Sequence, residues 1–277
     1  MISHYRVESP PVSTTRQQPR IMIDPVSRTF CLVVALSCAL AASATGQRTI
    51  LAVGAHAGDV ELTSGALLAK QHRLGDRVVI LHLTLGEGGN PRLAPDRYAD
   101  QKRREAVAAA AALGAEVLFG PYRDGELPDD DATRRYVADV IRSVKPSFVI
   151  THWRESIHKD HAATSRIVTD AVLLASLEGV KTEHAAFRGV RAVWYAENWE
   201  DASGFQPYIS VDVTSAMDTW RNAVTKYEFV RGGVSDFRYL DYYDALSIVR
   251  GALARKGRAE AFDIDASGKR RILDSLP

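Results

Sequence analysis

Cysteine is nearly absent from this sequence. Its 277 residues include two cysteines, Cys31 and Cys38, and both lie in an apolar stretch near the N-terminus. A chain cleaved after that stretch would hold no cysteine. Neither a disulfide nor a cysteine nucleophile is therefore expected in the remaining domain.

An excess of charge of either sign is missing as well. The formal net charge is +1, which gives no electrostatic footprint for binding nucleic acid. Two hydrolase signatures are also absent, the G-x-S-x-G nucleophile elbow and the H-E-x-x-H zinc helix. The glycine-rich turn at 54–58 lacks the G-x-G-x-x-G spacing of a dinucleotide loop. These absences weigh against nucleic-acid binding, two common hydrolase types and a nicotinamide cofactor.

The N-terminal segment has the layout of a secretory signal. Arg28 precedes an apolar run at 30–40, and small residues follow at 41–44 in an Ala-x-Ala pattern. The run is short for a membrane-spanning helix, which favours a cleaved signal over an uncleaved N-terminal anchor.

We therefore expect two parts, a signal segment at 1–46 and one domain at 47–277. Cleavage is expected near Thr45 or Gln47. The mature protein would then be secreted or periplasmic and would have no stable membrane anchor.

Apolar and amphipathic segments alternate along the rest of the chain, at a spacing of roughly thirty residues. This alternation predicts βαβ units, an α/β fold and a mostly parallel sheet. The expected strands are 49–54, 78–83, 116–119, 148–151, 190–196 and 208–213, and the expected helices are 60–74, 98–113, 131–144, 162–177, 215–230 and 242–256. In such sheets, ligands bind outside the carboxyl ends of the strands.

The first reactive cluster follows the first strand and contains His56 and Asp59. Asp59 alone would be interpreted as the N-cap of the next helix. With an imidazole three residues before it, a metal-ligand role becomes the better interpretation. Histidine and carboxylate together suit Zn²⁺ when one coordination position is left to water.

The second cluster follows the fourth strand and contains His158, Asp160 and His161. Three of the eight histidines fall within 152–161, which argues against a merely solvated helix start. Because both clusters follow strands of one parallel sheet, we expect them on the same rim. His152 is expected to fill space near the site rather than to bind metal.

At these residues the sequence resembles the PIG-L/LmbE-like family of zinc-dependent N-acetylglucosaminyl de-N-acetylases. The family motif Ala-His-Pro-Asp-Asp corresponds to 55–59, and the motif His-Pro-Asp-His corresponds to 158–161. Further similarity lies at 83–87, 104–114, 123–125 and 259–262. The resemblance covers nearly all of 49–262 and implies a Rossmann-like three-layer fold with the active site at the carboxyl ends of the strands.

The resemblance also implies roles for individual residues. Zinc would be held by His56, Asp59 and His161, while His158, assisted by Asp160, would stabilise the oxyanion or protonate the leaving amine. The substrate contacts would be Arg104 and Asp124. On pattern alone, these last two would be a solvated helix residue and a turn residue.

One position departs from the family pattern. Gly58 aligns with the aspartate that acts as general base on the attacking water. Loss of a general base typically slows a reaction by about 10²–10⁴-fold, which predicts a slow enzyme rather than an inert one. Glu61, Glu87 or His158 is a candidate replacement, and Gly58→Asp is expected to raise turnover.

The sequence therefore predicts a zinc-dependent hydrolase that removes the acetyl group from an N-acetylated amino sugar or its conjugate. The partner would be a small molecule or glycan carrying that sugar. A non-catalytic glycan-binding protein on a deacetylase scaffold is the alternative, because a binding protein needs no base at Gly58. Hydrolysis of another amide would need the same residues.

Overall fold

The structure is a computed structural model that describes residues 47–201, 203–266 and 268–270. The predicted signal segment at 1–46, including both cysteines and the cleavage site, lies outside the described residues. The signal segment, its cleavage and the domain boundary therefore stay predictions. Within the described part of the chain, no helix is both long enough and apolar enough to cross a membrane.

Seven strands of the described residues form a single mixed sheet in the order β3-β2-β1-β4-β5-β7-β6. The first five strands in this order pair in parallel, whereas β7 is antiparallel to both β5 and β6. The strands are β1 (Thr49–Gly54), β2 (Arg77–His82), β3 (Glu116–Phe119), β4 (Phe148–His152), β5 (Ala192–Ala196), β6 (Ile209–Asp212) and β7 (Ala259–Ile264).

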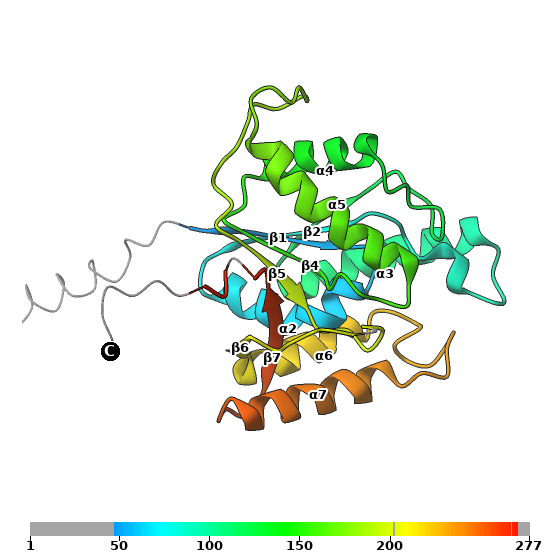
Figure 1. Ribbon diagram of the computed structural model, residues 1–277. Helices are drawn as coiled ribbons and strands as arrows, with labels where there is room; N and C mark the ends of the chain where they lie inside the picture. The colour runs from blue at the N-terminus through cyan, green and yellow to red at the C-terminus, as the bar shows by residue number, and fades with distance from the viewer. Residues whose placement is uncertain (1–46, 202, 267, 271–277) are drawn as a thin grey trace, which may run out of the picture. The chain divides into compact units, whose positions relative to one another are not determined.

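Helices cover both faces of this sheet, which gives three layers. Figure 1 shows α4 and α5 on one face and α2, α6 and α7 on the other. The helices are α2 (Asp59–Arg73), α3 (Pro95–Leu113), α4 (Asp131–Val144), α5 (Lys159–Ser176), α6 (Met217–Val224) and α7 (Tyr239–Leu253), with short 3₁₀ turns η1 (Glu87–Gly89) and η2 (Thr214–Ala216).

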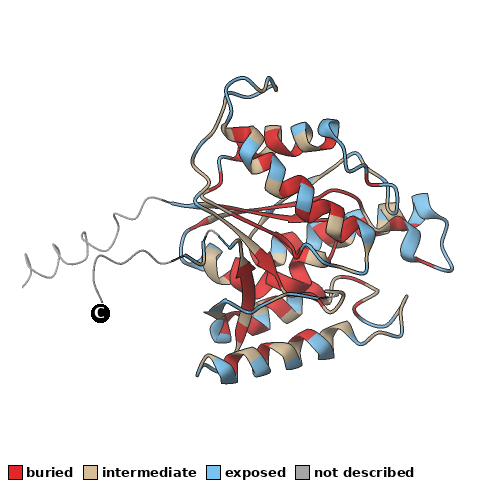
Figure 2. Cartoon of the chain, in the orientation of Figure 1, coloured by how far each residue is buried: buried red, intermediate tan, exposed pale blue. Residues whose placement is uncertain are grey.

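The period of two along β1 divides the core between the two helix layers. Ile50 and Ala52 pack with α2, α3 and α6, whereas Leu51 and Val53 pack with α4 and α5. All four side chains are buried, as are most positions of the central strands in Figure 2. A strand covered on both faces is continuously apolar, which is why the sequence marks β1 so clearly.

The strand order reverses next to β1, because β2 and β3 lie on one side of it and β4 and β5 on the other. The crevice outside the carboxyl ends at such a reversal is the usual ligand site of open α/β sheets. The carboxyl ends of β1 and β4 both open into this crevice.

The predicted α/β, Rossmann-like three-layer fold is confirmed, and two elements differ from expectation. The helix expected at 215–230 ends at Val224, because the following residues turn inward toward the core. Strand β7 was not expected; it carries two acidic residues within six, yet it lies inside the sheet between β5 and β6.

Candidate metal centre and its pocket

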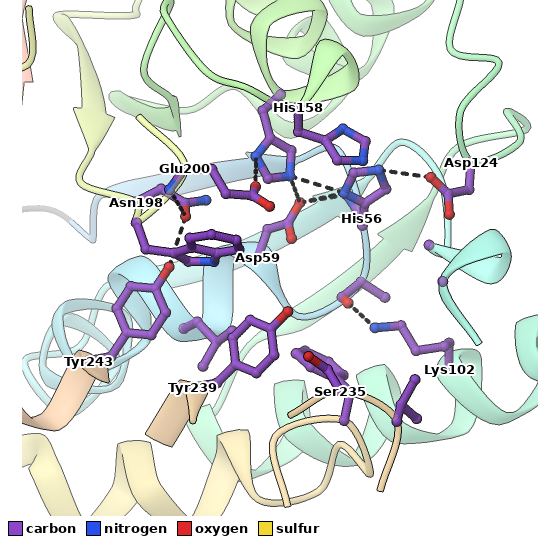
Figure 3. A pocket seen from close by; sticks show the side chains of 18 of the residues that line it. His56, Asp59, Lys102, Asp124, His158, Asn198, Glu200, Ser235, Tyr239 and Tyr243 are labelled. Atoms are coloured by element: carbon purple, nitrogen blue, oxygen red, sulfur yellow. Dashed lines mark hydrogen bonds and ion pairs between the residues drawn. The ribbon is translucent and has the colours of Figure 1, made fainter. Parts of the chain in front are cut away.

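Two loops at the carboxyl edge of the sheet bring the sequence clusters together. His56 lies in the turn after β1, and Asp59 is the first residue of α2. His158 is the N-cap of α5, and His161 lies in the first turn of that helix. Because β1 and β4 are neighbours, residues about a hundred positions apart meet at one point (Figure 3).

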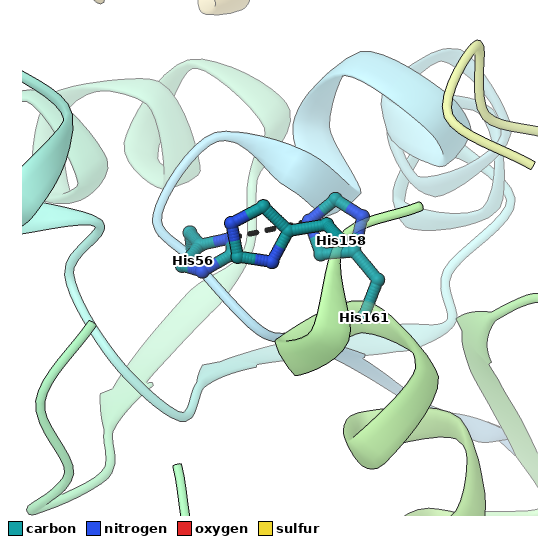
Figure 4. A group of neighbouring side chains, drawn as sticks. All are labelled: His56, His158 and His161. Carbon is teal, nitrogen blue, oxygen red and sulfur yellow. Dashed lines mark hydrogen bonds between the residues drawn. The ribbon is translucent and has the colours of Figure 1, made fainter. Parts of the chain in front are cut away.

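Three ligand atoms form a nearly equilateral triangle at this point. His56 Nδ1 lies 3.1 Å from His161 Nε2, and Asp59 Oδ2 lies 3.2 Å and 3.3 Å from these two nitrogens. Figure 4 shows the two imidazoles facing each other. In a tetrahedral zinc site with bonds of about 2.0–2.1 Å, ligand atoms stand about 3.3–3.4 Å apart. The triangle therefore has the size of one face of such a site.

The outer nitrogens of both imidazoles face carboxylates. His56 Nε2 lies 3.1 Å from Asp124 Oδ1, and His161 Nδ1 lies 2.8 Å from Glu200 Oε2. A carboxylate on the outer N–H holds the ring in one orientation and one tautomer. We assign the proton of each neutral ring to its outer nitrogen, which leaves both inner lone pairs aimed into the triangle.

The triangle also attracts positive charge. Burial lowers the pKa of His161, but the Asp59 charge and hydrogen bonds to Asp59 and Glu200 raise it to about 9. Burial likewise lowers the pKa of His56, and nearby carboxylates raise it well above its usual value. Burial raises the pKa of Asp59, and the two imidazoles lower it well below its usual range. A proton or a metal ion would be stabilised at the same place.

His152, at the end of β4, supports the triangle from behind. Its ring stacks on His161 with the ring centres 4.1 Å apart, and its Nε2 accepts a hydrogen bond from Ala55 N at 3.0 Å. Burial, the first cause, together with the His161 charge lowers its pKa to about 4, so the ring is neutral at ordinary pH. Its lone pair is engaged by the backbone, which suits a packing role.

His158 lines the pocket beside the triangle, as the sequence suggests for a catalytic group. Its ring centre lies 4.6 Å from that of His56, and its Nδ1 accepts a hydrogen bond from Asp160 N at 3.2 Å. Burial and the neighbouring His56 charge lower its pKa. The neutral ring therefore carries its proton on Nε2.

The Asp160 carboxylate lies beside His56, and among the described residues it forms no ion pair with His158. Asp160 Oδ2 accepts a hydrogen bond from Gly125 N at 2.8 Å and lies 3.6 Å from His56 Nε2. The side chain of His158 caps α5 through the Asp160 backbone, so the carboxylate points to the loop at Gly125 instead. Asp160 supports the site through His56 and that loop.

The structure does not bring Arg104 to the pocket. Arg104 is exposed on α3, whereas Lys102 of the same helix is 4% exposed and lines the pocket. Two residues correspond to about 200° around a helix, so the two side chains lie on opposite faces. Asp124 does line the pocket, where its carboxylate faces His56.

The pocket above the triangle has a volume of about 190 Å³. Pockets for drug-sized molecules are roughly 300–1,000 Å³, so this one suits a smaller ligand. Its walls combine aromatic rings with polar and charged groups. The lining residues beyond the two clusters include Tyr98, Asn198, Trp199, Glu200, Phe229, Ser235, Tyr239 and Tyr243 (Figure 3).

Sequence reasoning missed most of these walls. Residues 198–200 follow β5, a third parallel strand ending at the same rim, and this signal was available in the sequence. Phe229 and Ser235 lie in the irregular segment between α6 and α7. No local pattern places that segment over the sheet edge.

Comparison with known proteins decides the family. A family model described as GlcNAc-PI de-N-acetylase, PIG-L, matches residues 51–172, which hold His56, Asp59 and His161. Residues 51–172 of this chain therefore form a PIG-L family domain.

The relatives of this chain include a hydratase and deacetylases. The chain is 26% identical over 220 residues to 4-oxalmesaconate hydratase of Pseudomonas putida, which covers 76% of this chain and 83% of the relative. It is 29% identical over 214 residues to 1D-myo-inositol 2-acetamido-2-deoxy-alpha-D-glucopyranoside deacetylase of Acidothermus cellulolyticus. This match covers 62% of this chain and 73% of the relative.

A solved structure supports the fold. The N,N'-diacetylchitobiose deacetylase of Pyrococcus horikoshii has a TM-score of 0.71 and 19% identity, covering 91% of this chain and 97% of that chain. At this identity the likeness concerns the fold alone. The PIG-L relatives thus include deacetylases of N-acetylglucosamine-type substrates, together with a hydratase.

Gly58, which the resemblance aligns with the general base of the family, has little room for a side chain in this protein. Gly58 is the N-cap of α2 and has a φ of 107°. A β-carbon built there would lie 2.7 Å from Phe229 Cζ and 3.7 Å from Lys102 Nζ. Phe229 therefore fills the space into which a carboxylate at position 58 would extend.

Two of the candidate replacement bases do not line the pocket. Glu61 is fully buried, where its Oε1 lies 3.1 Å from His82 Nε2 and accepts a hydrogen bond from Tyr227 OH at 2.7 Å. Glu87 accepts a hydrogen bond from Asp124 N at 3.1 Å. Of the three candidates, His158 alone lines the pocket.

Proposed function

We propose that this protein is a zinc-dependent hydrolase that removes the acetyl group from an N-acetylated amino sugar or its conjugate. The products would be acetate and a free amine. The observation that carries the proposal is the triangle of His56 Nδ1, Asp59 Oδ2 and His161 Nε2, with edges of 3.1–3.3 Å, at the floor of a pocket. Deacetylases of N-acetylglucosamine-type substrates among the relatives support it.

The residues around the triangle supply the remaining chemistry. A zinc ion held there would polarise the amide carbonyl and lower the pKa of a water molecule in the site. His158 can donate its Nε2 proton to the developing oxyanion or to the leaving amine. Asp124 and Glu200 keep the two ligand rings oriented. Trp199 and Tyr239 supply apolar faces for a sugar ring.

Amine release tests this proposal directly. The full-length protein is loaded with zinc and incubated with a panel of N-acetylhexosamines and their conjugates. We expect free amine from at least one substrate, and none above background from His161→Ala. His72→Ala is the matched control, because His72 is exposed and distant from the pocket lining.

Two results would count against the hydrolase. Amine release at the level of His161→Ala for every substrate would contradict it. Tight binding of an N-acetyl sugar without turnover, even at high protein concentration, would favour the glycan-binding alternative.

A second activity is favoured by one of the relatives. Addition of water to an activated double bond also uses a water activated at a metal, so it is a competing reaction for the same site. The relative from Pseudomonas putida is named as a hydratase of 4-oxalmesaconate, the anion of an organic acid. Consumption of 4-oxalmesaconate by the zinc-loaded protein, followed by ultraviolet absorbance, would support the hydratase over the deacetylase.

We also propose that the protein acts outside the cytoplasm, on the basis of the signal-type pattern at 28–44. N-terminal sequencing of exported protein should give a start near Thr45 or Gln47. An intact 30–40 segment in the membrane fraction would contradict cleavage.

A further inference from the structure

We propose that Lys102 recognises an anionic group of the ligand, and that the natural substrate therefore carries a carboxylate. This inference rests on the proposed function only in taking the pocket as the substrate site. Lys102 Nζ reaches the pocket from α3 and contacts the carbonyl oxygen of Ala57 at 2.5 Å (Figure 3).

The ammonium of Lys102 is short of partners. An ammonium has three N–H donors, and one is used by Ala57 O. Among the described residues, no carboxylate lies within 4 Å of Lys102 Nζ. The side chain is nevertheless 4% exposed, and a buried charge without a counter-charge is costly. A ligand carboxylate would supply the missing partner.

The carboxylates of the pocket are already committed elsewhere. Asp124 faces His56, Glu200 faces His161, and Asp59 lies between both rings. A metal ion in the triangle would balance part of this negative charge. Lys102 is then a charged residue of the pocket lining without a carboxylate as its ion-pair partner.

Aromatic rings hold the ammonium in place without neutralising it. Lys102 Nζ lies 4.1 Å from the ring centre of Phe229, 4.9 Å from that of Tyr227 and 5.9 Å from that of Tyr98. Cation–π contacts of this kind stabilise the charge and leave the N–H groups available. Burial lowers the Lys102 pKa to about 8 against the raising effect of more distant carboxylates, so the charged form predominates at neutral pH.

A carboxylate fits this place better than a phosphate does. One ammonium balances one negative charge, whereas a phosphate monoester would add up to two beside Asp59 and Asp124. Like charges held close together in a partly enclosed site repel strongly. The volume of about 190 Å³ also favours a compact acid.

The test compares acids with their uncharged esters on the zinc-loaded, full-length protein. N-acetylmuramic acid is measured against its methyl ester by calorimetry, so that charge is the main difference. A second, sugar-free pair is cyclohexanecarboxylate, which carries a single negative charge, and its methyl ester. We expect at least one acid to bind about tenfold or more tightly than its ester.

Variants assign the preference to Lys102. In Lys102→Met the acid preference should fall to within about twofold, with ester binding retained, and in Lys102→Arg a clear preference should remain. Zinc content and thermal unfolding confirm that each variant is folded and loaded. If Lys102→Met does not fold, Lys102→Arg and Lys102→Gln provide the same charged and neutral comparison.

The outcomes separate this inference from the proposed function. An acid preference that persists in Lys102→Met would place the anion on the metal and overturn the inference, as would equal binding of acid and ester in the unmodified protein. A Lys102-dependent preference with cyclohexanecarboxylate, but no binding of the sugar pair, would support the inference and contradict the amino-sugar substrate.

Discussion

The ring of Phe229 occupies the space where a side chain at Gly58 would begin. A β-carbon at position 58 would lie 2.7 Å from Phe229 Cζ and 2.9 Å from Phe229 Cε1, closer than such atoms approach in proteins. The backbone of Gly58 also has a φ of 107°, which side chains of L-amino acids rarely adopt. Two independent effects therefore disfavour a side chain at Gly58.

The first prediction is that Gly58→Asp lowers stability before it can affect catalysis. Backbone strain should cost about 1–3 kcal/mol. The overlap with Phe229 should cost about 1–3 kcal/mol more. The gain in turnover that the sequence suggests for this substitution is therefore not expected from Gly58→Asp alone. Urea unfolding of both proteins gives the difference in free energy.

Two further variants divide the effect into its parts. Gly75→Asp is the matched control, because Gly75 has a φ of 94° and nothing within 4 Å of its β-carbon position. It should show the strain without the overlap. Combining Gly58→Asp with Phe229→Ala removes the overlap. The double variant should therefore regain the free energy of unfolding lost to the overlap, less the cost of the cavity that Phe229→Ala leaves. Equal stability of Gly58→Asp and the unmodified protein would contradict the prediction.

The parallel part of the fold was predictable because it rests on local signals. β1 and β4 are apolar runs bounded by turn residues, and each is followed by a histidine cluster. Parallel strands end at one edge, so the meeting of His56 and His161 followed from strand type alone.

The contacts that complete the site depend on long-range packing instead. Lys102 meets Ala57, and Phe229 meets Gly58, across 45 and 171 positions of the chain. No periodicity relates such pairs. The family resemblance implies Arg104 as a substrate contact, whereas Lys102 of the same helix lines the pocket, and only the orientation of the helix separates the two.

Strand β7 was missed for a related reason. Its Glu260 and Asp263 mark an exposed segment by composition, yet both carboxylates accept backbone hydrogen bonds. Glu260 accepts from Ala66 N and Leu67 N of α2, and Asp263 accepts from Gln206 N and Ile264 N. Tertiary partners thus override the local pattern.

The second prediction concerns the triangle. His56→Ala, Asp59→Ala and His161→Ala should each abolish tight zinc binding, because two ligand atoms would remain of three. In the unmodified protein, zinc at a hundred times its Kd should stabilise the fold by about 2.7 kcal/mol, and chelation should reverse this. Thermal unfolding with and without zinc measures the effect.

His72→Ala is the control for these ligand variants. His72 is exposed and lies at the far end of α2, so its zinc response should equal that of the unmodified protein. Undiminished zinc stabilisation in His161→Ala would rule out the triangle as the metal site.

The third prediction separates two roles for the carboxylates behind the ligand rings. Asp124→Asn and Glu200→Gln should each weaken zinc binding by about 10–100-fold, since both face an outer imidazole nitrogen. Competition with a chromophoric chelator measures zinc affinity. Asp218→Asn, at an exposed position, should leave it unchanged. If Asp124→Asn alters KM but not zinc affinity, Asp124 contacts substrate, as the family resemblance implies, and does not support His56.

The last prediction follows from Glu260. Burial raises the pKa of this carboxyl from 4.5 to about 8, although hydrogen bonds from Leu67 N and Ala66 N lower it in part. Between these two values the folded protein keeps a proton that the unfolded chain has released. The unfolded state then binds fewer protons, so the free energy of unfolding falls as pH rises from about 4.5 to 8.

Glu260→Gln introduces an uncharged side chain of the same shape, so the stability of this variant should not depend on pH through position 260. Denaturant unfolding at a series of pH values should therefore show the variant gaining on the unmodified protein as pH rises, up to about 8 and no further. Glu178→Gln is the control, because the Glu178 side chain is 79% exposed. Its free energy of unfolding should follow the same pH profile as that of the unmodified protein. Parallel profiles for Glu260→Gln as well would mean that the two backbone hydrogen bonds outweigh burial and keep Glu260 ionised.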